Sequence, residues 1–267
     1  MPLLQLILVA LIQGITEFLP VSSSGHLILL PSLTGMEDQG QAIDVAVHVG
    51  TLAAVVLFFW SNVREAILGL PRALTGRIDT AGARLALGLI VATIPTVIFG
   101  AALHFTGLSD ALRSITVIGW TMLIFGIVLY LADQRGSSHK TASDWGAKDA
   151  LIMGLWQMLA LIPGTSRSGI TITGARGLGY NREDGARIAM LMSIPTIIAS
   201  GLLLGTEVAL NADVGLMRDM GIAALLAMVS ALAALALMMR LLKSVSFTPY
   251  VIYRVVLGIV LLIIAYQ

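Results

Sequence analysis

The chain has 267 residues, of which 57% are hydrophobic and 12% charged, and its mean hydropathy is +0.93. Such a composition, with apolar runs of about twenty residues, is typical of a helical integral membrane protein. The formal net charge of +1 gives no reason to expect nucleic acid as a partner, and the lack of cysteine excludes disulfides, thiolate catalysis and Cys-ligated metals.

The first interruption of this apolar character is the segment 13–26, Gln-Gly-Ile-Thr-Glu-Phe-Leu-Pro-Val-Ser-Ser-Ser-Gly-His. Lipid offers no partner for a carboxylate or for free backbone N–H groups, so we expect the segment to be buried in protein or to line a wet cavity. No basic leader precedes it, and Glu17 stands where the apolar core of a cleaved signal would lie. We therefore expect the segment to belong to the mature protein.

Two side chains of this segment suit a hard cation. Gln13 and Glu17 are four residues apart, so on a helix an amide oxygen projects beside a carboxylate. Mg²⁺ is bound through one or two carboxylates and completes its shell with water and substrate phosphate. Gln13 and Glu17 are therefore candidate metal ligands, although they make a weak site alone.

The turn after Pro20 is rich in hydroxyl groups. Ser22, Ser23 and Ser24 precede a helix that we expect from about residue 27, whose N-terminus would present N–H groups to a phosphate. Ser22 and Ser24 are candidates for phosphate contact, with helix capping as the alternative. His26 is the candidate nucleophile or general acid-base of the segment.

Six apolar stretches are long enough to cross a bilayer. They cover residues 41–60, 84–105, 115–131, 186–205, 220–239 and 249–266.

Charge in the connections predicts the orientation of these spans, because cytoplasmic loops carry the excess of Lys and Arg. The basic residues of one side include Arg64, Arg72, Arg77, Arg84, Arg135, Lys140, Lys148, Arg176, Arg182, Arg187, Arg240 and Lys243. The other side holds Arg113 and Arg218 beside the acidic Glu37, Asp38, Asp110, Glu207 and Asp213. We expect the first side to be cytoplasmic and both termini to lie on the other.

The second polar interruption is the segment 163–169, Pro-Gly-Thr-Ser-Arg-Ser-Gly. Lys148 before it and Arg176 after it belong to the same basic side, so an even number of crossings separates them. Two full crossings need about forty residues, but only 27 positions lie between these two residues. The spacing predicts a re-entrant helix-loop-helix that turns at Pro163.

The residues of this second segment are suited to an anion. Arg167 offers a planar fork that matches phosphate oxygens, and N–H groups at the start of the returning helix add donors. The candidate phosphate-binding residues are Gly164, Thr165, Ser166, Arg167, Ser168 and Thr171.

A short internal similarity connects the two segments. Aligning Pro20 with Pro163 pairs Ser23 with Ser166, and three candidate spans follow each segment. Each half then contains three crossings, which is an odd number, so a duplication predicts that the second half is inverted relative to the first. The two polar turns of such an inverted repeat meet inside the bundle. We expect one integral membrane domain over residues 1–267, with halves of about 1–135 and 146–267; a chance match is the alternative.

Both segments closely resemble motifs of the undecaprenyl-diphosphatase family, the bacitracin-resistance family of bacterial membrane phosphatases. Its Pro-Gly-x-Ser-Arg-Ser-x-x-Thr motif is matched from Pro163 to Thr171, and its glutamate-rich motif by Gln13, Glu17, Ser22, Ser23 and His26. Length and hydropathy agree along the whole chain, as does Ser-Phe-Thr-Pro-Tyr at residues 246–250. Gln13 stands where many relatives carry a second glutamate, which puts a strict two-carboxylate metal site in doubt here.

This resemblance implies hydrolysis of undecaprenyl diphosphate to the monophosphate, with Mg²⁺ or Ca²⁺, on the periplasmic or outer side of the bacterial inner membrane. It implies an all-α fold with six transmembrane helices and two re-entrant segments in an inverted repeat. Glu17 would act on metal or as base, Arg167 would hold the diphosphate, and Ser23, His26 or a water molecule would attack. The expected partners are the lipid substrate and membrane lipid; bacitracin would inhibit by sequestering the substrate, and a homodimer is left open.

A lipid flippase or anion transporter is the alternative function, because inverted repeats with broken helices are typical of secondary transporters. Such a protein needs an anion site but no nucleophile, so Glu17, His26 and Arg167 together favour catalysis. The other common class of membrane lipid phosphatase is rejected, since the chain has no Arg-Pro pair and no histidine after Arg167.

Three further polar residues lie within predicted spans. Asp44 and His48 are one helical turn apart and are either partners of the site or simple polar packing. Arg254 lies near the cytoplasmic start of the last span, and we expect its charged head to reach the membrane surface.

Overall fold

The computed structural model describes residues 1–108, 112–211 and 213–267, without the side chains of residues 32–33 and 203–211. Asp110 and the side chain of Glu207, both part of the charge comparison, thus lie outside the described residues.

The described chain is built of helices. In chain order these are α1 (Leu3–Phe18), α2 (Ser23–Thr34), α3 (Gly40–Phe58), α4 (Trp60–Leu74), α5 (Ala81–Thr106), α7 (Ile115–Arg135), α8 (Ala147–Met158), α9 (Arg167–Gly177), α10 (Arg182–Asn211), α11 (Val214–Leu241) and α12 (Thr248–Tyr266). Two 3₁₀ turns, Ala142–Asp144 and Leu159–Leu161, flank α8.

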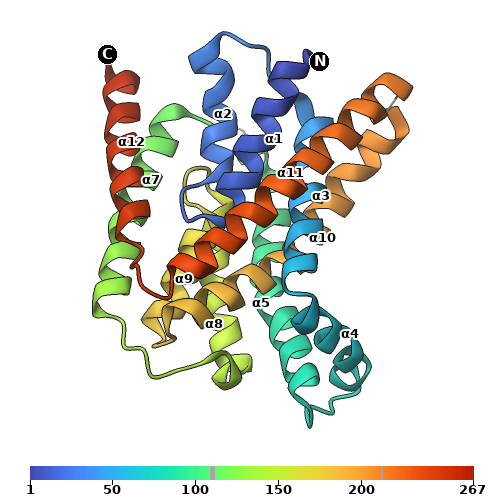
Figure 1. The fold of residues 1–267 in the computed structure, drawn as a ribbon, viewed down its shortest axis with the longest axis vertical. Coiled ribbons are helices and arrows are strands. Elements are labelled where there is room, and N and C mark those ends of the chain that lie inside the picture. Colours follow the sequence, from blue (N-terminus) through green and yellow to red (C-terminus); the bar gives the residue numbers. More distant parts are fainter. Residues whose placement is uncertain (109–111, 212) are drawn as a thin grey trace.

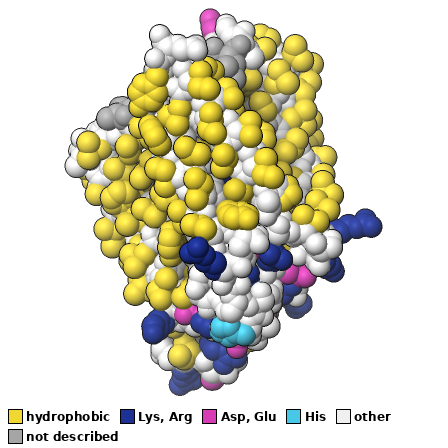
Figure 2. Space-filling model, turned by 90° about the vertical axis from the view of Figure 1, so that its left-hand side faces the viewer, with side chains coloured by type: hydrophobic (Ala, Val, Ile, Leu, Met, Phe, Trp, Pro, Cys, Tyr) yellow, Lys and Arg dark blue, Asp and Glu magenta, His cyan; other side chains and the backbone are white. Residues whose placement is uncertain are grey.

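Six of these helices are long and apolar enough to cross a membrane: α3, α5, α7, α10, α11 and α12. They coincide with the six stretches predicted from the sequence, so this prediction is confirmed. Hydrophobic side chains cover most of the face shown in Figure 2, whereas Lys and Arg gather at its lower end. Both termini lie at the opposite end of the molecule (Figure 1).

Besides α4, which has 15 residues, the short helices of the described chain are α1, α2, α8 and α9, with between 11 and 16 residues. At 1.5 Å per residue, the longest rises about 24 Å, less than the roughly 30 Å of a hydrocarbon core. The turns that connect α1 to α2 and α8 to α9 lie side by side near the middle of the molecule (Figure 1).

Glycine allows α11 to approach two other helices closely. A Cβ on Gly14 of α1 would lie 1.9 Å from Oγ of Ser230, and one on Gly50 of α3 would lie 2.1 Å from the carbonyl oxygen of Ala224. Both neighbours belong to α11. Helices α1 and α3 are thereby packed against one long helix, which places their polar residues next to one another.

A buried carboxylate ties the helix ends at the basic side of the molecule. Asp133 of α7 is 2% exposed and accepts hydrogen bonds from Nε of Arg176 at 3.2 Å and Nε of Arg182 at 2.7 Å. It also accepts one from the backbone N–H of Phe247 at 3.2 Å. The ends of α7, α9, α10 and α12 are therefore joined through one side chain.

Candidate active site

The helices α2 and α9 begin with the same local structure. Their N-cap residues, Ser22 and Ser166, have φ of 76° and 69°, a left-handed conformation that is uncommon outside glycine. Each hydroxyl accepts a hydrogen bond from a backbone N–H three residues later, on Gly25 at 3.3 Å and Gly169 at 3.1 Å. The caps pair Ser22 with Ser166, one residue away from the pairing of Ser23 with Ser166 expected from the sequence.

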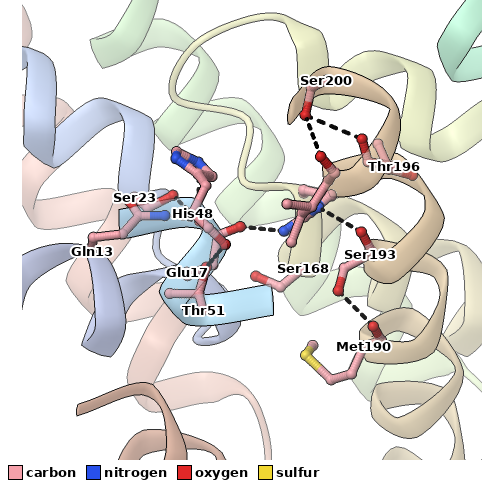
Figure 3. A network of polar contacts seen from close by, with 12 residues as sticks. Gln13, Glu17, Ser23, His48, Thr51, Ser168, Met190, Ser193, Thr196 and Ser200 are labelled. Atoms are coloured by element: carbon pink, nitrogen blue, oxygen red, sulfur yellow. Dashed lines mark hydrogen bonds and ion pairs between the residues drawn. The ribbon is translucent and has the colours of Figure 1, made fainter. Parts of the chain in front are cut away.

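Glu17 is the centre of a polar network between these two turns (Figure 3). The side chain is 7% exposed, and its Oε1 forms an ion pair with the guanidinium of Arg167. Its Oε2 accepts hydrogen bonds from Nε2 of Gln13 at 2.9 Å and from Oγ of Ser23 at 2.6 Å. The structure thus brings together candidate residues that lie up to 154 positions apart in the chain.

Arg167 is held from a second direction as well. Its NH1 donates to the carbonyl oxygen of Ser193 on α10 at 3.3 Å, and its side chain keeps 16% exposure. The guanidinium is therefore oriented by α1 and α10 while part of it still faces open space.

That space is a polar cavity of about 150 Å³. Its walls include Glu17, Ser22, Ser23, Ser24, His48, Ser166, Arg167 and Ser200. A larger cavity of about 740 Å³ shares His48, Ile197 and Ser200 with it and extends to Asp38 and Arg113. The polar cavity thus has a wider neighbour on the side of the molecule away from the basic end.

The two histidines of the region lie differently. His48 lines the polar cavity; its Nδ1 donates to the carbonyl oxygen of Asp44 at 2.7 Å, and its Nε2 lies 3.9 Å from Oε2 of Glu17. His26 is absent from the described lining of this cavity. Its Nδ1 donates to the carbonyl oxygen of Ser22, and its Nε2 bonds to the hydroxyl of Tyr253, both at 2.6 Å.

Four other predicted phosphate-binding residues do not line the described part of the polar cavity. Ser168 donates from Oγ to the carbonyl oxygen of Leu19 at 2.9 Å, and Thr171 donates to that of Arg167 at 2.7 Å. The hydroxyl of Thr165 is buried without a hydrogen-bond partner. Gly164 has a φ of +85°, and a Cβ there would lie 2.2 Å from Oγ1 of Thr121. Gly164 and Thr165 belong to the turn before α9, and Ser168 and Thr171 belong to α9 itself. Any contact of these residues with phosphate needs their backbone N–H groups or a movement of the turn.

The expectation for Arg254 is wrong. Its side chain does not reach the membrane surface but is fully buried, and it donates to the carbonyl oxygens of Pro20, Gly164 and Thr165. Hydropathy alone misses this role, because the partners are backbone groups from distant segments. The available signal was its position six residues into α12, since a cation inside a span marks a functional contact.

The donor set around Glu17 is compatible with a hard cation. Oε1 of Gln13 is buried without a hydrogen-bond partner, and it lies on the amide that already contacts the carboxylate of Glu17. Among the described residues no group of three His, Cys, Asp or Glu side chains could hold a metal ion. A cation bound by both side chains would therefore need the amide of Gln13 to turn its Oε1 toward the carboxylate of Glu17, with water and substrate phosphate completing the shell.

Comparison with known proteins gives a consistent result. The family model described as bacitracin resistance protein BacA matches residues 6–260. The undecaprenyl-diphosphatase of Ruegeria sp. (strain TM1040) is 86% identical over the whole of both chains, and that of Ruegeria pomeroyi is 76% identical, also over both whole chains. The undecaprenyl-diphosphatase of Teredinibacter turnerae is 45% identical, over 98% of this chain and 99% of its own.

Proposed function

The chain belongs to the bacitracin resistance protein BacA family, and we propose that it is an undecaprenyl-diphosphatase that acts in the polar cavity around Glu17. It hydrolyses undecaprenyl diphosphate to undecaprenyl phosphate and inorganic phosphate, which recycles the lipid carrier for cell-wall synthesis. The observation that supports this site most is the ion pair between Glu17 and Arg167, one from each polar segment, with the hydroxyl of Ser23 2.6 Å from the same carboxylate.

In the proposed reaction, Oγ of Ser23 attacks the terminal phosphorus while Glu17 accepts the hydroxyl proton. The bond between this phosphorus and the bridging oxygen breaks, and the lipid monophosphate leaves with the bridging oxygen. The leaving bridging oxygen takes up the proton from Glu17, which is then free to act as base again. Glu17 deprotonates a water molecule that attacks the phosphoserine, the bond between phosphorus and Oγ of Ser23 breaks, and Oγ recovers this proton as inorganic phosphate leaves. Arg167 and the N-termini of α2 and α9 stabilise the charge that develops on the phosphoryl oxygens.

Ser23 is preferred over His26 as the nucleophile because of hydrogen bonding. Ser23 donates directly to the proposed base, whereas both ring nitrogens of His26 are engaged, with Ser22 and Tyr253. We propose that His26 supports the turn before α2 and does not attack phosphorus. Direct attack by water is the remaining alternative.

We also propose that Mg²⁺ or Ca²⁺ is bound through Gln13 and Glu17. The buried, unpartnered Oε1 of Gln13 supports this assignment. A divalent cation there would supply positive charge beside the diphosphate.

The proposed architecture has α1–α2 and α8–α9 as re-entrant pairs in an inverted repeat. Gln13 and Gln157 both stand nine residues before a left-handed cap serine, both are buried, and both leave Oε1 without a partner. Helix α1 packs on α11, and α8 packs on α5, as such a repeat requires if α5 corresponds to α11.

We place the chain in the bacterial inner membrane with the active site open to the periplasmic or outer side and both termini on that side. The gathering of Lys and Arg at the end opposite the termini supports this orientation (Figures 1 and 2). Inhibition by bacitracin through the substrate, and a homodimer, stay predictions.

The decisive experiment measures inorganic phosphate released from undecaprenyl diphosphate by purified protein. We expect turnover by the wild type, and activity at least about 100-fold lower in Glu17→Ala and Arg167→Ala. Glu37→Ala removes an exposed carboxylate that lines neither described cavity and is the matched control. Wild-type protein that binds the lipid without turnover would contradict the enzyme and favour a flippase or transporter.

The same assay tests the cation. We expect chelation to reduce activity at least about tenfold and Mg²⁺ or Ca²⁺ to restore it. Full turnover after complete metal removal would refute the role proposed for Gln13 and Glu17 as ligands.

A further inference from the structure

Arg254 is a buried cation that contacts both polar turns. Its NH1 donates to the carbonyl oxygen of Pro20 at 3.5 Å, and its NH2 donates to those of Gly164 at 3.2 Å and Thr165 at 2.8 Å. Within residues 1–108, 112–211 and 213–267, no described carboxylate lies within ion-pair distance of it. Its charge is therefore compensated by backbone carbonyl groups, which are dipoles of fixed position.

The path of this side chain is built into the neighbouring helices. A Cβ on Gly169 of α9 would lie 2.7 Å from NH1 of Arg254, and one on Gly126 of α7 would lie 3.2 Å from its Cβ. Two further donated bonds, at 3.4 Å, go to the carbonyl oxygens of Thr121 and Met122 on α7. The guanidinium is thus fixed against α7 at the same time as it contacts the two turns.

The carbonyl groups of the two turns that Arg254 binds lie one or two residues before the caps of α2 and α9. Pro20 is two residues before Ser22, and Thr165 directly precedes Ser166. Ser23 follows the first cap and Arg167 follows the second. Any displacement of one turn relative to the other would therefore change the distance between Ser23 and Arg167.

We propose that Arg254 is a positioning residue that fixes the turn before α2 relative to the turn before α9, and so sets the separation of Ser23 and Arg167 in the polar cavity. It touches no substrate, because its side chain is fully buried and is not part of the described cavity wall. The kinetic consequence rests on the proposed function; the structural consequence does not.

The geometry of the guanidinium is what the role requires. Arginine presents five N–H donors in a rigid fork, whereas lysine has three donors on one compact charge. Arg254→Lys keeps the positive charge but cannot reach α7 and both turns from one position, so it separates the effect of the fork from the effect of the charge.

The test compares Arg254→Lys with Arg176→Lys. Arg176 is also a buried arginine with carbonyl partners, but it joins the helix ends at the basic side. We expect both variants to lower the melting temperature, and only Arg254→Lys to lower kcat, by about 10- to 100-fold with KM changed less than about threefold, since small misplacement of reacting groups is costly.

Hydrogen exchange gives a readout that does not depend on turnover. We expect the amides of residues 19–26 and 164–170 to exchange at least about tenfold faster in Arg254→Lys than in the wild type, and at the wild-type rate in Arg176→Lys. Unchanged exchange in both turns of Arg254→Lys would overturn the proposal whatever the activity. A wild-type kcat in that variant would overturn it as well, whereas an inactive wild type would contradict only the proposed function.

Discussion

At the scale of single residues, the site depends on a carboxylate and a guanidinium that neutralise each other in a poorly hydrated place. Removing one partner of such a pair leaves the other charge uncompensated, which costs about 3 kcal/mol or more, whereas removing both costs less than the sum. Glu17 and Arg167 are mostly buried, so this logic applies to them.

We therefore predict that Glu17→Gln and Arg167→Gln each lower the melting temperature and that the double variant is more stable than additivity implies. Thermal unfolding of all four proteins in one detergent measures the coupling. Strict additivity would show that the pair contributes nothing to stability and is present for chemistry alone.

The nucleophile gives a second prediction at this scale. We expect Ser23→Ala to reduce phosphate release at least about 1000-fold, because it removes the attacking atom. His26→Gln should reduce it by about 10- to 100-fold through the turn that His26 supports. Acid quenching of a turnover reaction with labelled substrate should trap an acid-stable phosphoserine in the wild type. An acid-labile phosphohistidine would instead identify His26 as the nucleophile, and no covalent adduct would indicate water.

The sequence predicted which residue types the site needs but not how each is arranged. Glu17, Ser23 and Arg167 belong to two motifs, and the inverted repeat predicted from the sequence places these motifs next to each other. Sequence alone leaves two roles open for His48, partner of the site or polar packing, since only the crossing of α1 and α3 brings its Nε2 to 3.9 Å from Glu17. The prediction for Arg254 is wrong because the sequence shows a charge within a span but does not show which carbonyl groups surround it.

At the scale of helices, close packing against α11 leads to a testable difference between two glycines. Gly50→Ala would place a methyl group 2.1 Å from a backbone oxygen of α11, so α3 must move away. We predict a destabilisation of about 1–3 kcal/mol, seen as a lower melting temperature.

Gly221→Ala is the matched control. Gly221 lies in α11 itself, and a Cβ there would meet no other atom within 4 Å. Alanine is the better helix former by about 1 kcal/mol in water, so this change should be neutral or stabilising. Equal losses in both variants would mean that the α3 to α11 contact tolerates a methyl group.

The spans were predicted well because hydrophobicity over twenty residues determines them with little help from tertiary contacts. The short helices were harder to place. Their pairing could be inferred from charge and motif, but the register of the caps differed by one residue, because left-handed φ angles at Ser22 and Ser166 cannot be read from residue type.

At the scale of the whole molecule, the proposed orientation in the membrane can be measured by cysteine labelling, because the chain has no cysteine of its own. Single cysteines can be introduced at two exposed positions. Glu37→Cys lies at the end of the molecule that holds both termini, and Gly146→Cys lies at the basic end. In intact cells, a membrane-impermeant maleimide should label only the first. Labelling of Gly146→Cys before lysis would show that the orientation in the membrane is the opposite of the proposed one.

The ion pair in the polar cavity has one more consequence, for selectivity among phosphate compounds. In the protein without substrate, the guanidinium of Arg167 is already occupied by Glu17, so an incoming anion must compete with an internal carboxylate. A lipid diphosphate brings two phosphoryl groups and an apolar chain to that competition, whereas free phosphate brings one group and no chain. We predict weak product inhibition, with an inhibition constant for inorganic phosphate at least about tenfold above the KM for the lipid, in initial-rate measurements. A protein of this kind would continue to turn over in a phosphate-rich medium, because its own carboxylate screens the binding arginine from the commonest competing anion.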